Sequence, residues 1–160
     1  MNDTEYMRLA LELAKKGCGW TSPNPMVGAV IVKDGQIIGQ GWHERYGQPH
    51  AERNALASCA VDPEGATMYV TLEPCPMCAG AILNARIRRV YYGARDEVMG
   101  ACGGVLNLFM EGFPRPPQLV GNVCGDECRD VLQTFFREVR EKNAENTNRS
   151  ADIVEDFTEF

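Results

Sequence analysis

Two pairs of side chains have the types and spacing of a metal centre. His50 and Glu52 are separated by one residue, and Cys75 and Cys78 follow in the segment Pro-Cys-Pro-Met-Cys. Zinc prefers nitrogen and sulfur ligands in a tetrahedron, and three protein ligands leave the fourth position for water, as in catalytic sites. The sequence therefore predicts one zinc ion per chain, held by His50, Cys75 and Cys78.

Glu52 is not needed as a ligand in this arrangement. A carboxylate beside the ion can take the proton of a water molecule and pass it to a leaving amine. The order His-x-Glu then Pro-Cys-x-x-Cys is typical of zinc deaminases, which replace a ring amine by oxygen and release ammonia. We therefore predict that Glu52 is catalytic. The alternative is a closed zinc site whose fourth ligand is one of four other side chains: His43, Cys102, Cys124 or Cys128.

Two further residues are candidate substrate contacts. Asn24 lies between Pro23 and Pro25, in a loop that can present an amide, although turn formation explains an Asn there equally well. His43 follows an apolar segment and either contacts substrate or is a surface histidine. One basic cluster is either a phosphate contact or an ordinary solvated face: Arg86, Arg88, Arg89 and Arg95.

The elements that must position these residues alternate between strand and helix. Apolar periodicity and turn signals predict strands at residues 27–33, 36–42, 67–71, 89–92 and 119–123. They predict helices at residues 4–16, 50–60, 74–85 and 106–110, and a last helix from Asp126 to about Lys142. Such alternation predicts an α/β fold with three layers, one sheet between helices.

Length and composition agree with one globular domain. The chain has 160 residues, of which 44% are hydrophobic, and its seven cysteines are an odd count that argues against a disulfide framework. No apolar run is long enough for a transmembrane helix, and the start does not read as a signal peptide, so we expect a cytoplasmic protein without membrane contact.

The charge is unevenly distributed along the chain. The formal net charge is -6, and residues 143–160, with five acidic residues and one Arg, account for -4 of it. The body, at -2, therefore offers no broad surface for nucleic acid. We expect a deaminase domain at residues 1–142 and a polar, acidic, flexible tail at residues 143–160.

These motifs resemble the cytidine deaminase superfamily, and two of its families at once. Residues 1–75 resemble the riboflavin-biosynthesis diaminohydroxyphosphoribosylaminopyrimidine deaminases. The matching segments are Ser22–Val30, Gly41-Trp42-His43 and Pro49–Ala55. The resemblance implies that Asn24, His43 and Glu52 face a pyrimidine. That family has a longer loop between its two cysteines, which holds the substrate phosphate, whereas only Pro76-Met77 stands there in this chain.

Residues 71–142 instead resemble the bacterial tRNA-specific adenosine deaminases. The matching segments are Thr71–Ile82, Asn84–Ile87 and Tyr92–Asp96. That family has Asn where this chain has His43, and its Asn helps to hold the flipped adenosine.

Both resemblances imply an α/β/α sandwich with a mixed five-stranded sheet, and a homodimer. We favour a small nucleotide-like substrate, namely a diaminopyrimidine nucleotide of the riboflavin-pathway type or a related aminopurine or aminopyrimidine. The alternatives are deamination of the tRNA wobble adenosine to inosine, and a non-catalytic binding module stapled by zinc.

Overall fold

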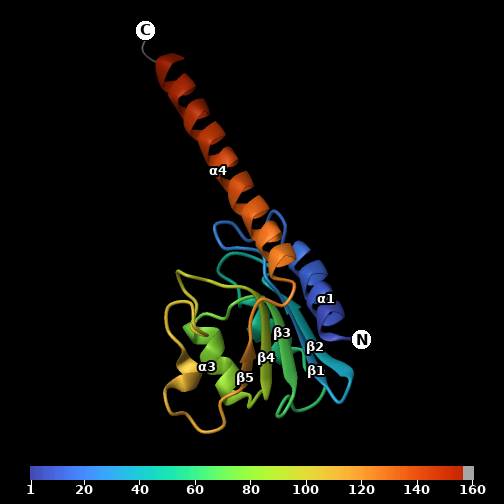
Figure 1. Cartoon of the computed structure of the whole chain (residues 1–160). Coiled ribbons are helices and arrows are strands. Elements are labelled where there is room, and N and C mark those ends of the chain that lie inside the picture. Colours follow the sequence, from blue (N-terminus) through green and yellow to red (C-terminus); the bar gives the residue numbers. More distant parts are fainter. Residues whose placement is uncertain (157–160) are drawn as a thin grey trace.

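The computed structural model of the chain describes the backbone of residues 1–156 and the side chains of residues 1–149 (Figure 1). Five strands form one sheet in the order β2-β1-β3-β4-β5. Their bounds are Gly28–Lys33 for β1, Gln36–Trp42 for β2, Thr67–Leu72 for β3, Arg89–Ala94 for β4 and Gln118–Val120 for β5. Strand β1 pairs antiparallel with β2 and β3, whereas β3, β4 and β5 run parallel. The mixed five-stranded sheet is confirmed.

The antiparallel hairpin follows from its two turn residues. Asp34 and Gly35 have φ angles of 51° and 75°. Two successive residues with positive φ form the turn that matches the twist of paired strands, and Asp-Gly is a preferred sequence for it. The turn returns the chain along β1, so that the loop after β2 reaches the end of the sheet where the site lies.

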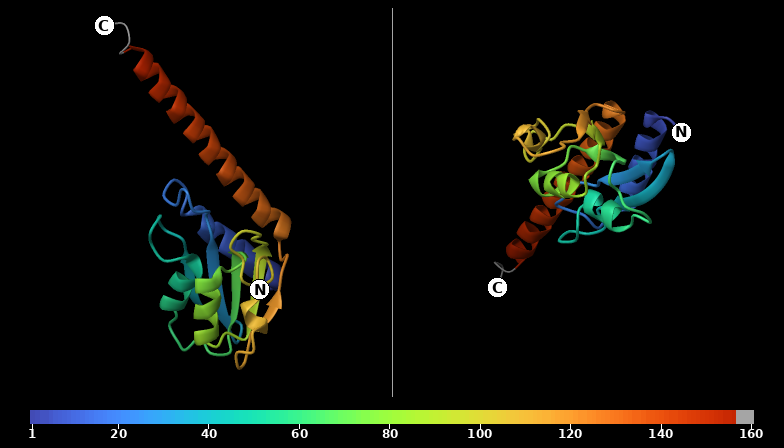
Figure 2. Two further views of the ribbon diagram at one scale, coloured as in Figure 1. Left: turned by 90° about the vertical axis from the view of Figure 1, so that its left-hand side faces the viewer. Right: turned by 90° about the horizontal axis from the view of Figure 1, so that it is seen from below.

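Helices cover both faces of the sheet. Helices α2 (Ala51–Ala57) and α3 (Pro76–Asn84) and the short η1 (Leu108–Met110) share one apolar cluster with Ala29, Ile31 and Met68. Helices α1 (Asp3–Lys15) and α4 (Gly125–Asp156) share the other with Val30 and Val32. Successive residues of β1 therefore point into opposite layers, as strand geometry requires. The three-layer α/β/α sandwich is confirmed (Figures 1 and 2).

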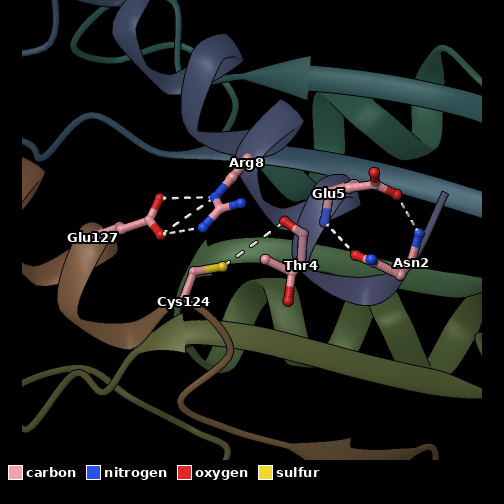
Figure 3. Close-up of polar contacts among 6 residues, drawn as sticks. All are labelled: Asn2, Thr4, Glu5, Arg8, Cys124 and Glu127. Carbon is pink, nitrogen blue, oxygen red and sulfur yellow. Dashed lines mark hydrogen bonds and ion pairs between the residues drawn. The ribbon is translucent and has the colours of Figure 1, made fainter.

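Helix α1 lies very close to the sheet. A Cβ atom added at Gly28 would stand 1.9 Å from the carbonyl oxygen of Ala10, so this position of β1 tolerates no side chain. Asn2 caps the helix, with its side chain accepting from the Glu5 N–H and Glu5 accepting from the Asn2 N–H (Figure 3). This reciprocal pair satisfies two backbone donors that would otherwise lack partners.

Helix α4 begins beside α1. Arg8 on α1 pairs with Glu127 on α4 at 3.0 Å, and the Cys124 thiol donates to the Thr4 carbonyl oxygen at 3.8 Å (Figure 3). Both members of the ion pair are about half exposed, so it contributes at most about 1 kcal/mol. Burial of Cys128 and packing of Leu132 against the α1 cluster hold the two helices together.

The extent of α4 differs from the expectation. The helix was expected to end near Lys142, but it continues to Asp156 and extends away from the sheet (Figures 1 and 2). The expected end is wrong because residues 143–156 contain neither Gly nor Pro, the residues that stop a helix. The flexibility of the tail stays a prediction, and its residues 157–160 lie outside the described part of the chain.

Two other expectations are confirmed with shorter bounds. The strand expected at residues 119–123 is β5, with three residues, and the helix expected at residues 50–60 is α2, with seven. Within residues 1–156, no helix combines the length and the apolar character that crossing a bilayer requires.

Candidate metal centre and substrate pocket

His50 and Glu52 are placed by the start of α2. His50 is the N-cap residue, with extended backbone, and Glu52 lies in the first turn. Glu52 is 4% exposed, so its carboxylate is held inside the protein rather than in solvent.

Cys75 and Cys78 are placed by the start of α3. Strand β3 ends at Leu72, and Cys75 is the N-cap of α3, followed by Pro76 at the first helical position. Proline suits that position because its missing N–H would have no partner there. Cys78, one turn later, is completely buried, while Cys75 is partly exposed.

The three expected ligand side chains meet. The Nδ1 atom of His50 lies 3.6 Å from the Sγ atom of Cys75 and 3.5 Å from that of Cys78. A tetrahedral zinc ion with Zn–S lengths of about 2.3 Å and a Zn–N length of about 2.0–2.1 Å sets nitrogen and sulfur ligands about 3.6 Å apart. The donor set and its spacing therefore fit zinc. Among the described residues, these three form the only group of His, Cys, Asp and Glu ligand atoms within 4.8 Å of one another.

The cluster favours a thiolate. Hydrogen bonds from Cys78 and from His50 lower the pKa of Cys75 to about 4. The same contact with Cys75, together with burial, raises the pKa of the Cys78 thiol. The hydrogen bond to Cys75 also raises the pKa of His50. Thiolate sulfur is the form of cysteine that binds metals.

Glu52 lies beside the cluster without belonging to it. Burial raises the pKa of its carboxyl group to about 7. A buried carboxyl group that exchanges its proton near neutral pH has the property expected of a general acid and base.

One cavity of about 260 Å³ contains the expected site. Five of the six residues expected from the sequence line it: Asn24, His43, His50, Glu52 and Cys75. The sixth, Cys78, lies buried behind Cys75 on α3. Asn24, His43, Glu52 and two of the three expected ligands therefore face one cavity that is open to one side.

Asn24 and His43 contact each other. The Nδ1 atom of His43 lies 3.1 Å from the carbonyl oxygen of Pro49, which can only accept, so Nδ1 carries a proton and donates. In the neutral ring, Nε2 then accepts, and it lies 3.3 Å from the amide nitrogen of Asn24. This contact turns the Asn24 amide so that its Nδ2 faces His43 and its carbonyl oxygen points elsewhere.

Glu73 lines the same cavity, and it is not among the site residues expected from the sequence. It is 2% exposed, and its carboxylate accepts backbone N–H groups from Asp96 at 2.9 Å, Cys102 at 2.9 Å and Gly104 at 2.7 Å. These three bonds hold the loop of residues 95–104, whose Asp96 and Met99 also line the cavity. The available signal was a carboxylate directly after an apolar strand.

The closed zinc site is not formed. Cys124 and Cys128 pack with α1 on the opposite face of the sheet from α2 and α3. His43 lines the cavity, but its two ring nitrogens contact Pro49 and Asn24. None of the candidate fourth ligands joins the described His50 cluster.

The expected basic cluster is not formed either. Arg89 begins β4, and Arg95 follows its end. A six-residue strand separates its ends by about 17 Å, so Arg95 cannot share a site with the other three arginines. Arg86 instead pairs with Glu64 at 3.5 Å, and Arg95 donates to the Gly103 carbonyl oxygen at 2.9 Å.

Known sequences resemble this chain over most of its length. The zinc-binding region of cytidine and deoxycytidylate deaminases matches residues 1–94. The diaminohydroxyphosphoribosylamino-pyrimidine deaminase of Buchnera aphidicola is 50% identical over 147 residues, which cover 88% of this chain and 97% of that protein. The riboflavin biosynthesis protein RibD of Actinobacillus pleuropneumoniae is 42% identical over 149 residues, which cover 89% of this chain. The chain spans only 39% of the length of that RibD.

Solved structures show the same fold. A diaminohydroxyphosphoribosylaminopyrimidine deaminase/5-amino-6-(5-phosphoribosylamino)uracil reductase from Thermotoga maritima is 39% identical, with a TM-score of 0.73 over 88% of this chain and 42% of that one. A structure from a study of tRNA:A34 deaminases is 33% identical, with a TM-score of 0.66 over 81% of this chain and 99% of that one. Both families resembled by the sequence are therefore also found among structural neighbours.

Proposed function

The chain belongs to the family that shares the zinc-binding region of cytidine and deoxycytidylate deaminases, and on this premise we propose that it deaminates a diaminohydroxyphosphoribosylaminopyrimidine. The reaction replaces an exocyclic amine of the pyrimidine by oxygen, consumes water and releases ammonia. The chain is a zinc-dependent deaminase, and its relatives at 42–50% identity support this substrate over tRNA.

One observation carries the proposal. The buried Glu52 carboxylate, the His50 and Cys75 ligands and the Asn24 amide all face one cavity of about 260 Å³. A proton carrier, a metal-binding cluster and a hydrogen-bonding amide are the parts that hydrolytic deamination requires.

The residues divide the work between them. His50, Cys75 and Cys78 would hold one zinc ion, which supplies Lewis acidity that makes a water molecule easier to deprotonate. Glu52 takes the proton of the attacking water and delivers it to the amine nitrogen, which then leaves as ammonia. Because Glu52 is buried, bulk water does not compete with the substrate for this proton.

Asn24 and His43 would position the ring. His43 fixes the Asn24 amide through the 3.3 Å contact, and both line the cavity. The Asn24 carbonyl oxygen is then available to accept a hydrogen bond from a ring N–H or an amino group of the pyrimidine. A site built for such a bond discriminates strongly against rings that cannot make it.

The test is ammonia release by the zinc-loaded protein with the diaminopyrimidine ribotide as substrate. The wild-type chain is expected to turn it over. Glu52→Gln keeps the shape of the side chain but removes its base, and should lower kcat about 10²- to 10⁴-fold. Glu12→Gln, at an exposed carboxylate on α1, is the matched control and should match wild type.

An anticodon stem-loop carrying adenosine at the wobble position serves as the competing substrate. Turnover of the stem-loop without turnover of the ribotide would contradict the proposal in favour of tRNA deamination. Full activity of Glu52→Gln on the ribotide would remove the assigned mechanism. Bound zinc with no turnover of either substrate would support a binding module.

The chain would act as a homodimer. Met77 on α3 and Met110 on the adjacent η1 are 49% and 81% exposed, and Phe113 nearby in sequence is 47% exposed. Large exposed apolar side chains of this kind support a protein–protein interface. Sedimentation velocity should give twice the mass of the chain, and Met110→Glu should shift the protein towards monomer.

A further inference from the structure

A second cavity adjoins the one that contains the metal ligands. It has a volume of about 730 Å³, and it shares four lining residues with the first: Pro25, Leu72, Asp96 and Met99. The two cavities are therefore neighbouring compartments divided by the loop that Glu73 holds.

The size of the first compartment leaves part of a nucleotide outside it. At about 260 Å³ it falls below the range of about 300–1,000 Å³ typical of ligand pockets. It suits the ring that reacts, whereas a ribosyl phosphate attached to that ring must extend through the opening. The second compartment is the adjoining space that can receive it.

Two arginines line the second compartment from different elements, Arg95 directly after β4 and Arg129 on α4. Arg95 donates through Nη2 to the Gly103 carbonyl oxygen at 2.9 Å. Arg129 donates through Nη1 to Asn122 at 3.2 Å and through Nη2 to Asp126 at 2.5 Å. Each guanidinium has five N–H donors, so these contacts orient the groups and leave further donors.

The compartment offers guanidinium donors for one compact anion rather than a broad basic surface. Its walls also carry Asp96 and Glu97, and Asp96 uses Oδ1 to accept the backbone N–H groups of Val98 and Met99 at 2.9 and 3.0 Å. Two guanidinium groups with Asp96, Glu97 and the Arg129-bound Asp126 beside them do not form the continuous basic track that an RNA backbone requires. A single phosphate monoester can instead be held by paired guanidinium donors.

We propose that Arg95 and Arg129 bind the terminal phosphate of the nucleotide substrate, in the place of a longer loop between Cys75 and Cys78. The inference rests on the proposed function, since that function supplies a substrate with a ribosyl phosphate. The segment between the two cysteines is only Pro76-Met77 and carries no cationic side chain, so the phosphate must be recognised elsewhere.

The test compares the ribotide with the same molecule lacking its phosphate. Wild type is expected to prefer the ribotide by 10-fold or more in kcat/KM. Arg95→Gln and Arg129→Gln should each lower kcat/KM for the ribotide by about 10- to 100-fold, mainly through KM, because each removes charge-assisted hydrogen bonds. Both variants should lower kcat/KM for the dephosphorylated substrate far less than for the ribotide, so that the preference for the phosphate falls.

Arg115→Gln is the matched control. Arg115 lines a third cavity with Arg86, and that cavity shares no lining residue with the first. The Arg115 substitution should affect neither substrate. An equal loss in all three variants would overturn the assignment, because it would show a general effect of positive charge rather than a phosphate site.

Inorganic phosphate provides a readout that does not depend on turnover. In NMR spectra of the zinc-loaded protein, added phosphate should shift the side-chain Nε–Hε signals of Arg95 and Arg129 and not that of Arg115.

Turnover of the ribotide without preference over its dephosphorylated form would overturn the phosphate site and leave the proposed function intact. Phosphate binding at the two arginines without ribotide turnover would overturn the proposed function and leave the phosphate site intact. Displacement of phosphate by an anticodon stem-loop that is also deaminated would overturn the small-nucleotide assignment.

Discussion

The Glu73 carboxylate accepts the backbone N–H of Gly104 at 2.7 Å, although the two residues are separated by 31 positions in the chain. The same Oε1 atom accepts from Cys102, and Oε2 accepts from Asp96. One buried side chain thereby fixes the loop that separates the two compartments. Glu73 is a positioning residue rather than a catalytic one.

Replacing Glu73 by Gln is expected to destabilise the protein. The amide has one acceptor oxygen instead of two, and its NH₂ group would face a backbone N–H that then lacks a partner. Hydrogen bonds to charged groups contribute about 1.5–3 kcal/mol each, so we expect the free energy of unfolding to fall by about 3 kcal/mol. Urea denaturation of the zinc-loaded wild type and variant measures this difference in the free energy of unfolding.

Glu97→Gln is the control for this substitution, because Glu97 is an exposed carboxylate within the same loop. Its effect should stay within about 0.5 kcal/mol, as for most surface positions. Equal stability of the Glu73 variant and wild type would show that the three bonds do not hold the loop.

Asn24 and His43 are expected to act as a pair. Each alanine substitution should lower kcat/KM for the ribotide by about 10-fold or more, since each removes a polar group from the cavity. Because the two side chains touch, the double variant should lose less than the sum of the single losses, by at least about 0.5 kcal/mol in transition-state free energy. Steady-state kinetics on the four proteins gives this coupling.

The combination of Asn24→Ala with Arg115→Gln should be additive, because Arg115 lies in a separate cavity. If the losses in transition-state free energy from Asn24→Ala and His43→Ala also add in the double variant, His43 does not orient the Asn24 amide.

Zinc content should follow the three ligands. We expect about one zinc ion per purified chain, and almost none in His50→Ala or Cys75→Ser, since three protein ligands leave no spare donor. Elemental analysis measures the ratio. Cys18→Ser changes an exposed cysteine and should retain full zinc. Retention of zinc by Cys75→Ser would require another ligand.

Gly28→Ala should show how closely α1 approaches the sheet. The added Cβ would meet the Ala10 carbonyl oxygen at 1.9 Å, so the helix must move, and overpacking of this kind costs about 1–3 kcal/mol. Gly80→Ala is the control on α3, where the added Cβ would meet no side chain and no atom of another element within 4 Å. It should stabilise the protein by about 0.5–1 kcal/mol through helix propensity. Thermal unfolding of both variants tests the contrast.

Much of the fold and the metal centre could be predicted from local patterns. The alternation of strands and helices predicts the three layers, and the spacing of His50, Cys75 and Cys78 predicts that they form one ligand cluster. These features depend on short stretches of chain, whose periodicity and capping are visible in the sequence. The polarity of residues 143–156 favours a frayed tail, but these residues contain no Gly or Pro, and α4 continues through them.

The contacts between distant loops could not be predicted. The role of Glu73 depends on the path of residues 96–104, which no periodic pattern specifies. The contact between Asn24 and His43 depends on how the loop before β1 meets the end of β2. Arginines near in sequence were grouped together, yet a strand stands between Arg89 and Arg95.

The pairing of α1 with α4 has a consequence for synthesis of the protein. One face of the sheet carries Tyr69 and Tyr91, which share an apolar cluster with residues of α1 and with Cys128 and Leu132 of α4. A nascent chain has made all five strands before α4 leaves the ribosome, so this face stays partly uncovered until the last fifth of the chain is translated. Exposed apolar surface of this kind promotes aggregation and attracts chaperones. Fragments that stop before residue 125 should therefore accumulate as insoluble protein, even though they contain every residue of the metal centre.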